Sequence, residues 1–288
     1  MADHRLVLIS DTHLSRTHPL FFYNWTITRD WIAEQKPDLV LSLGDVSLNG
    51  AGGDDDLVFA RMEYDRLPVP WAAVPGNHDV GNNLPDLRGE TTVDAERVAR
   101  YRRHFGADHW RRDLGDWSFV GINSLLLGSG MADEADQAAF LAETIAEIGA
   151  RAWVLCLHKP LYLDDPLATD LHQGCIFPEP RAALEAILAA NPPRMIISGH
   201  NHELWRHQID GRDHLWCPAT AFVSITDAPQ RGGGAKQTGF YDVRLSGETV
   251  DITSLRPDGF ISIDIGSWLK SGIGHYATFC DSPYPSAG

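Results

Sequence analysis

The chain has 288 residues, 43% of them hydrophobic and 22% charged, a composition typical of a globular protein that can bury a large core. Its 39 acidic residues outnumber its 24 basic ones and give a net charge of −15, which argues against a surface that follows a nucleic-acid backbone. The apolar run at 6–9 is too short for a signal peptide or a membrane span, and the four cysteines show no paired spacing. These features predict a reduced, cytoplasmic protein.

Short β-rich segments alternate with helical patterns through the first two thirds of the chain. Strands are predicted at 5–10, 38–44, 70–76, 116–123, 152–157 and 194–199. Helices are predicted at 28–35, 55–67, 93–106, 133–149 and 179–190. The pattern then becomes all-β, with strands predicted at 203–209, 213–219, 239–245 and 249–255.

This order of elements indicates one α/β domain with a mixed sheet, because strands and helices alternate first and hairpins follow. We assign residues 1–259 to this domain. Residues 260–288 have weak periodicity, and we expect them to form a tail that packs on the domain or on a second subunit.

Polar side chains follow five of the predicted strands, at the point where each strand ends. These clusters are Asp11 with His13, Asp45, Asn77 with His78 and Asp79, His158, and His200 with His202. Loops at the carboxyl ends of strands line the ligand crevice of an open α/β sheet, so we expect all five clusters at one sheet edge. Each cluster alone is typical of a turn or a helix cap. Together they offer carboxylate, carboxamide and imidazole groups, which borderline divalent metal ions accept.

The series D-x-H, G-D, G-N-H-D, H, G-H-x-H resembles that of the calcineurin-like binuclear metallophosphoesterases and covers about two thirds of the chain. The resemblance implies a two-sheet αββα sandwich with the metal site at the C-terminal ends of its strands. Within the family, the chain looks most like the bacterial phosphodiesterase branch, which includes cyclic-nucleotide phosphodiesterases, glycerophosphodiesterases and a phospholipase C-like group. The segment after Asp45 lacks the tyrosine of purple acid phosphatases, and the loop reads G-N-H-D rather than the G-N-H-E of protein phosphatases.

The resemblance also implies a role for each polar residue. Those that would hold the first metal ion are Asp11, His13 and His202, and those that would hold the second are Asn77, His158 and His200. Asp45 would bridge the two ions, His78 would be the catalytic imidazole, and Asp79 would orient its loop. Nitrogen and oxygen ligands with few carboxylates fit Mn, Fe, Zn or Co ions better than Ca²⁺ or Mg²⁺.

We therefore expect metal-dependent hydrolysis of a phosphodiester by a hydroxide shared between two ions, with His78 assisting the leaving group. A lipid or glycerophosphodiester is favoured as the substrate. The alternatives are a cyclic-nucleotide phosphodiesterase or a broad phosphomonoesterase of the same family, and a non-enzymatic scaffold. The charge balance argues against a nucleic-acid polymer as substrate.

Residues 20–25 form a run that is almost entirely apolar and aromatic. Consecutive residues point to all sides of a helix or to both sides of a strand, so this run cannot be hidden in one core. We expect the part of this run that the core does not cover to contact the tail, a second subunit in a homo-oligomer, or a substrate. We select His18, Phe22 and Tyr23 as candidate substrate contacts, with transient contact to a lipid surface as a further hypothesis.

Overall fold

Strands make up two sheets in the computed structural model, which describes residues 3–87, 89–209, 211–225 and 234–270. The first sheet has the order β11-β10-β1-β2-β3 and consists of β1 (His4–Ile9), β2 (Leu39–Ser42), β3 (Trp71–Ala73), β10 (Phe240–Ser246) and β11 (Thr249–Leu255). The second has the order β4-β5-β6-β7-β9-β8 and consists of β4 (Trp110–Leu114), β5 (Trp117–Gly121), β6 (Ala152–Cys156), β7 (Met195–Ser198), β8 (Trp205–Ile209) and β9 (Arg212–Trp216). The strands that precede the polar clusters are parallel within each sheet.

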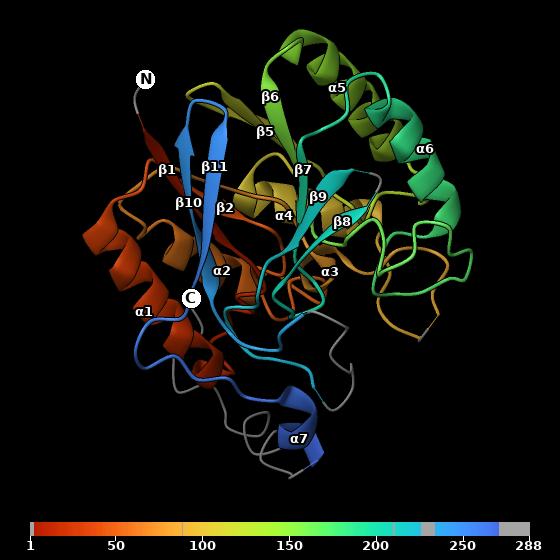
Figure 1. The fold of residues 1–288 in the computed structure, drawn as a ribbon. Helices are drawn as coiled ribbons and strands as arrows, with labels where there is room; N and C mark the ends of the chain where they lie inside the picture. Colours follow the sequence, from red (N-terminus) through yellow and green to blue (C-terminus); the bar gives the residue numbers. More distant parts are fainter. Residues whose placement is uncertain (1–2, 88, 210, 226–233, 271–288) are drawn as a thin grey trace.

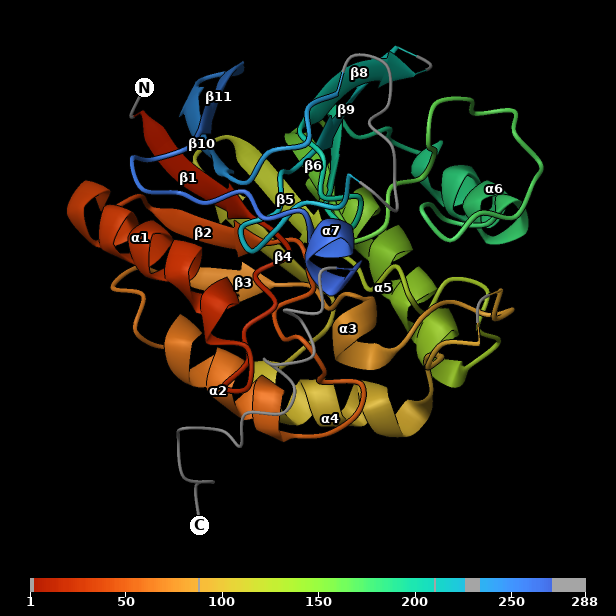
Figure 2. The same cartoon turned by 90° about the horizontal axis from the view of Figure 1, so that it is seen from below.

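Seven helices occur in the described residues, and the five longer ones cover the outer faces of the two sheets. The seven are α1 (Pro19–Gln35), α2 (Asp55–Tyr64), α3 (Asn77–Val80), α4 (Ala95–Phe105), α5 (Ala132–Ile148), α6 (Pro178–Leu188) and α7 (Ile265–Lys270). Figures 1 and 2 show α1 and α2 on the outside of the first sheet and α5 and α6 on the outside of the second. No helix among residues 3–270, the short undescribed gaps aside, is long and apolar enough to cross a bilayer.

The apolar run of β1 shows why the two sheets stack. Val7 and Ile9 pack in the core beneath the helices of the first sheet, whereas Leu6 and Leu8 pack in the core between the sheets. Alternate side chains of a strand point to opposite faces, so a strand that is buried on both faces needs a continuous apolar run. A third core lies between the second sheet and helices α5 and α6. The result is the four-layer αββα arrangement.

The structure confirms the two-sheet sandwich that the family resemblance implied, and the single mixed sheet expected from periodicity is wrong. Periodicity locates strands but does not say which strands pair. β10, for example, pairs with β1 from the other end of the chain. The edge strand β4 was not predicted, because Arg111, Arg112 and Asp113 give it no apolar alternation.

The N-terminal aromatic run belongs to α1, which begins at Pro19, nine residues before the predicted start of the helix. Phe21 and Trp25 are buried, Phe22 is half-buried and Tyr23 is exposed. At the other end of the chain, Phe260 and Trp268 pack on the domain. The rest of the predicted tail, 271–288, lies outside the described residues.

Candidate metal centre

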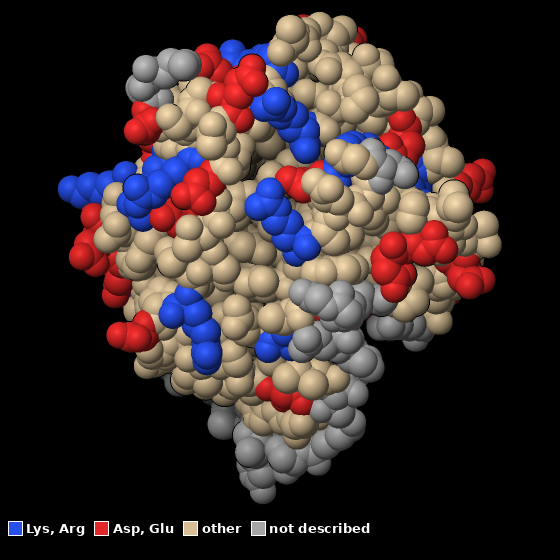
Figure 3. All heavy atoms as spheres, viewed as in Figure 1, with Lys and Arg blue, Asp and Glu red and all other residues tan. Residues whose placement is uncertain are grey.

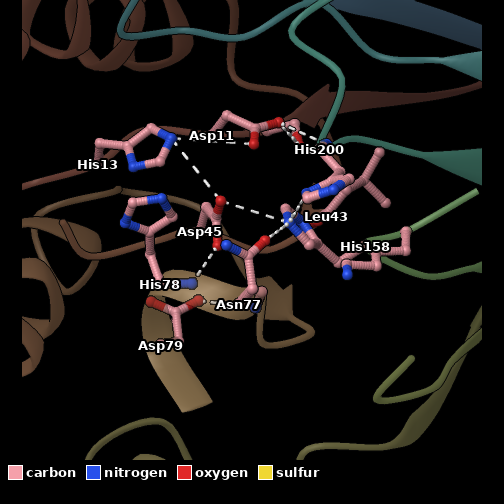
Figure 4. A network of polar contacts seen from close by, with 12 residues as sticks. Asp11, His13, Leu43, Asp45, Asn77, His78, Asp79, His158 and His200 are labelled. Carbon is pink, nitrogen blue, oxygen red and sulfur yellow. Dashed lines mark hydrogen bonds and ion pairs between the residues drawn. The ribbon is translucent and has the colours of Figure 1, made fainter. Parts of the chain in front are cut away.

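The polar clusters meet between the two sheets. Residues after β1, β2 and β3 approach from the first sheet, and residues after β6 and β7 approach from the second (Figure 4). The expectation that one sheet edge would deliver all five clusters is therefore wrong, because the ligand loops come from two sheets that face each other. The structure brings together all eight of the predicted ligand and catalytic side chains, namely Asp11, His13, Asp45, Asn77, His78, His158, His200 and His202.

Possible ligand atoms converge at two points. Around His158 Nε2 lie Asn77 Oδ1 at 3.1 Å, His200 Nδ1 at 3.2 Å and Asp45 Oδ2 at 3.3 Å. Around His202 Nε2 lie Asp11 Oδ1 and His13 Nε2, both at 3.2 Å. The two points are joined by Asp45, whose Oδ2 is also 3.8 Å from His13 Nε2. A carboxylate in this place can contribute to two metal ions at once.

Backbone carbonyl groups fix the orientation of the imidazoles. His158 Nδ1 donates to the carbonyl of Leu43 at 2.8 Å, and His200 Nε2 donates to that of Gln173 at 2.9 Å. His202 Nδ1 donates to the carbonyl of Phe222 at 2.8 Å. Each bond leaves the other ring nitrogen facing the centre, and metal-binding histidines in proteins are usually oriented by such a bond.

The buried carboxylates carry the charge that a cation site needs. Burial would raise the pKa of Asp11, but the nearby His202 outweighs burial and lowers that pKa to about 2. Burial likewise opposes ionisation of Asp45, yet His158 and His78 hold its pKa well below the usual range. Asp11 Oδ1 is buried and receives no hydrogen bond within the described residues. A buried anionic oxygen without a donor fits a metal ligand, so the residues present suit the ions that the sequence implies.

The imidazoles complete the donor set. Burial, with the neighbouring His78 next in size, lowers the pKa of His13, and burial with Lys159 lowers that of His200. Both rings are neutral at pH 7 and offer a lone pair. Burial opposes the charged form of His158, but Asp45 outweighs it and raises that pKa to about 9. Because a metal ion needs the neutral ring, binding at His158 would displace a proton.

The ligand loops are held in an unusual backbone conformation. Six non-glycine residues in the described ranges have φ in the left-handed region, and one of them is Lys36 at the end of α1. The other five are predicted ligands, namely Asp11 (51°), His13 (42°), Asp45 (50°), His200 (70°) and His202 (48°). Such residues cost energy and persist where the surrounding structure holds them, typically at functional sites.

Two glycines allow the loops to approach one another. A Cβ atom on Gly76 would lie 2.1 Å from Asp45 Oδ1, and one on Gly199 would lie 1.9 Å from Ser10 Oγ. Neither position has room for a methyl group. The glycines next to the clusters thus let the backbone pass close to the ligands, in keeping with what glycine permits.

Asp79 ties two of the ligand loops together. Its carboxylate accepts hydrogen bonds from the backbone N–H groups of Gly76, Val46 and Ser47 and from the Ser47 hydroxyl, at 2.6 to 3.1 Å. Burial, followed by the charge of Asp45, raises the pKa of Asp79 to about 6. All its oxygen contacts are donors from the loops after β2 and β3, so its position suits loop orientation rather than metal binding.

A cavity of about 560 Å³ opens in front of this centre. Besides the ligands, its lining includes Leu48, Phe222 and Ile265, and polar side chains such as Gln173 and Lys236. Sequence reasoning missed all five. Phe222 and Ile265 follow no motif, and only the fold brings them to the ligands.

The three candidate substrate contacts lie elsewhere. None of His18, Phe22 and Tyr23 is among the described residues that line the cavity. Phe22 packs against Phe59 with ring centroids 5.7 Å apart, and Tyr23 points to solvent. The aromatic run reaches the cavity wall through Phe21 instead, whose ring lies 4.8 Å from that of Phe222.

Comparison with known proteins agrees with this geometry. A family model described as calcineurin-like phosphoesterase matches residues 4–204. A probable cyclic nucleotide phosphodiesterase of Synechococcus sp. is 27% identical over 196 residues, which cover 66% of this chain and 68% of that protein. Metallophosphoesterase 1 of Macaca fascicularis is 27% identical over 268 residues; the match covers 73% of this chain and 64% of that protein, somewhat less than two thirds.

Solved structures show the same fold at low identity. A dimetal phosphatase from Danio rerio has a TM-score of 0.56 at 13% identity, with 87% of this chain and 95% of that chain covered. A purple acid phosphatase from yellow lupin seeds has a TM-score of 0.63 at 12% identity, with 91% and 53% covered. GAP50, an anchor in the inner membrane complex of Plasmodium, has a TM-score of 0.61 at 14% identity, with 100% and 99% covered. At these identities, the similarity concerns the fold alone.

Proposed function

Because the chain belongs to the calcineurin-like phosphoesterase family, we propose that it hydrolyses a phosphodiester with the help of two metal ions. The observation that carries this proposal is Asp45, which lies between two groups of possible ligand atoms. Asp11, His13 and His202 would hold one ion and Asn77, His158 and His200 the other, with Mn, Fe, Zn or Co as the suitable elements. Two such ions, when bound, supply a water of lowered pKa and neutralise the phosphate oxygens.

His78 is the proton donor in this proposal. Its Nδ1 donates to the carbonyl of Leu48 at 2.7 Å, and its backbone N–H donates to Asp45 Oδ1 at 2.8 Å. The ring stands edge-on to that of His13, with centroids 4.6 Å apart. These contacts leave Nε2 as the atom that can give a proton to the departing alkoxide, which is poor as an unprotonated leaving group.

A lipid or glycerophosphodiester is the substrate class we favour. The cavity combines apolar and polar walls and therefore suits a diester whose two alcohols differ in polarity. On the face shown in Figure 3, Lys and Arg are scattered among Asp and Glu, and the net charge is −15, so a small substrate is favoured over a nucleic-acid polymer. A cyclic nucleotide is the second candidate, because a relative at 27% identity carries that activity in its name.

A substrate panel tests this proposal. The Mn²⁺-loaded protein is given an alkyl phosphodiester, its phosphomonoester, cyclic AMP, glycerophosphocholine and a phospholipid, with Asp45→Asn as the inactive control. We expect diester turnover at least tenfold faster than monoester turnover. Failure of the metal-loaded protein to hydrolyse any diester would overturn the proposal.

A further inference from the structure

One side of the cavity is apolar. Leu48, Phe222 and Ile265, which we call the apolar wall, come from three distant parts of the chain. They belong to one hydrophobic cluster together with Phe21 and Trp268. The described cavity lining holds no other large aliphatic or aromatic hydrocarbon side chain.

The apolar wall is fixed by the segment that leads into α7. Val223 N–H donates to the carbonyl of Ile263, and Ile265 N–H donates back to the carbonyl of Val223, both at 2.9 Å. Ile225 N–H donates to Asp264 Oδ1 at 2.9 Å. Figure 2 shows α7 and α3 at the same end of the molecule, the end that faces the viewer. Ile265 therefore belongs to a segment whose backbone is hydrogen-bonded to the chain around Val223, and these bonds fix its place at the cavity.

The apolar wall touches the residues closest to the chemistry. The ring of Phe222 stacks on that of His13, with centroids 4.7 Å apart and an interplanar angle of 28°, and lies 4.6 Å from His202. Leu48 accepts the hydrogen bond from His78 Nδ1 on its carbonyl oxygen. The His13 ring in turn stands edge-on to that of His78, with centroids 4.6 Å apart, so a group that departs next to His78 lies one ring away from Phe222.

The rest of the cavity is polar. It includes amide, hydroxyl, carboxylate and ammonium groups, for example those of Asn82, Glu90, Thr91, Gln173, Glu203 and Lys236. Burying an alkyl or aryl group among them would desolvate polar atoms without replacing their hydrogen bonds. The apolar half of a diester is therefore directed to the wall next to His78.

We propose that the apolar wall binds the leaving alcohol, so that the substrate is a phosphodiester with an apolar leaving alcohol and a polar alcohol that stays on phosphorus. The inference rests on the function proposed above. A water oxygen bonds to phosphorus, and the bond from phosphorus to the apolar alkoxide oxygen breaks. His78 gives that oxygen its proton, and the proton released by the water restores His78. The products are an apolar alcohol and a polar phosphomonoester.

Ethyl 3-phenylpropyl phosphate tests this inference, because its two alkoxides have nearly the same intrinsic leaving ability. We expect the Mn²⁺-loaded wild type to release 3-phenylpropanol over ethanol at least tenfold, which corresponds to about 1.4 kcal/mol. Ile265→Asn should lower this product ratio at least threefold, and Ile265→Leu should retain it. The control is Ile261→Asn, the same substitution at an exposed position of the same segment. Metal content and melting temperature identify a variant that has misfolded.

The product ratio separates the two proposals. Equal release of both alcohols by the wild type, or a ratio that is the same in Ile265→Asn and wild type, would overturn the role of the apolar wall while phosphodiester hydrolysis stands. No hydrolysis of this or any other diester would overturn the proposed function and the apolar wall's role with it.

Discussion

A single methyl group at position 76 should empty the metal centre. A Cβ atom there would lie 2.1 Å from Asp45 Oδ1, and real Cβ contacts essentially never fall below 3.0 Å. The carboxylate would have to move by about 0.9 Å, the difference between these distances. Metal–ligand distances tolerate only about 0.2 Å, so the shift is more than four times what coordination allows. Because Asp45 lies between both groups of ligands, we expect Gly76→Ala to lose both ions.

The assay is metal content per chain after dialysis against Mn²⁺, followed by diester turnover. We expect two ions per chain in the wild type, fewer than about 0.5 in Gly76→Ala, and at least about 10²-fold slower turnover. Overpacking should also lower the unfolding free energy of the metal-free variant by about 1–3 kcal/mol. Gly53→Ala is the matched control, because a Cβ atom there meets nothing within 4 Å and its effect should stay within about 0.5 kcal/mol. A Gly76→Ala protein that binds two ions as tightly as wild type would refute the shared role of Asp45.

Asp45, His78 and Asp108 can each be tested by one substitution. Asp45→Asn should lower metal occupancy at both sites, since a neutral amide cannot offset two dications; elemental analysis that finds two ions per chain would contradict this. His78→Ala should keep both ions but lower kcat on an alkyl diester by about 10²–10⁴, with a much smaller effect on an aryl diester whose leaving group needs no proton. Asp108 is buried, and contacts with His109, Arg102 and Asn123 outweigh its burial and lower its pKa to about 2. Because this folded-state pKa lies below the ordinary value of 3.8, the ionised group stabilises the fold above pH 3.8, and the contribution disappears as pH falls through 2. Denaturation in EDTA should therefore show the stability advantage of wild type over Asp108→Asn shrinking by about 1 kcal/mol between pH 5 and pH 3; an unchanged advantage would contradict the prediction.

The candidate metal ligands were predictable because chemistry limits such residues to few types at fixed places after strands. Asp11, Asp45 and His158 follow buried strands whose apolar runs are legible in the sequence. Nothing local tells which sheet a strand joins, so the single sheet was expected in place of two. The edge strand β4 was missed because an exposed edge tolerates charged residues.

Residues that line the cavity were harder to predict, because they follow no spacing rule. Phe21, Phe22 and Tyr23 are equal candidates in the sequence, and only the rotation of α1 decides that Phe21 points to Phe222. Ile265 lies more than 60 residues beyond the last ligand, His202, and reaches the cavity through backbone pairing with Val223. Tertiary contacts of this kind produce no periodic pattern in the sequence.

The candidate metal ligands come from two facing sheets, so a bound metal ion would also affect the mechanics of the fold. The chain between Asp45 and His158 runs from one sheet to the other, so an ion bound to both would act as a cross-link that closes a loop of more than 100 residues. Chelation would then do more than stop catalysis. It would allow the ends of β2 and β6 to move apart. We therefore expect faster amide hydrogen exchange in the loops after β2 and β6, while the cores beneath the outer helices keep their protection.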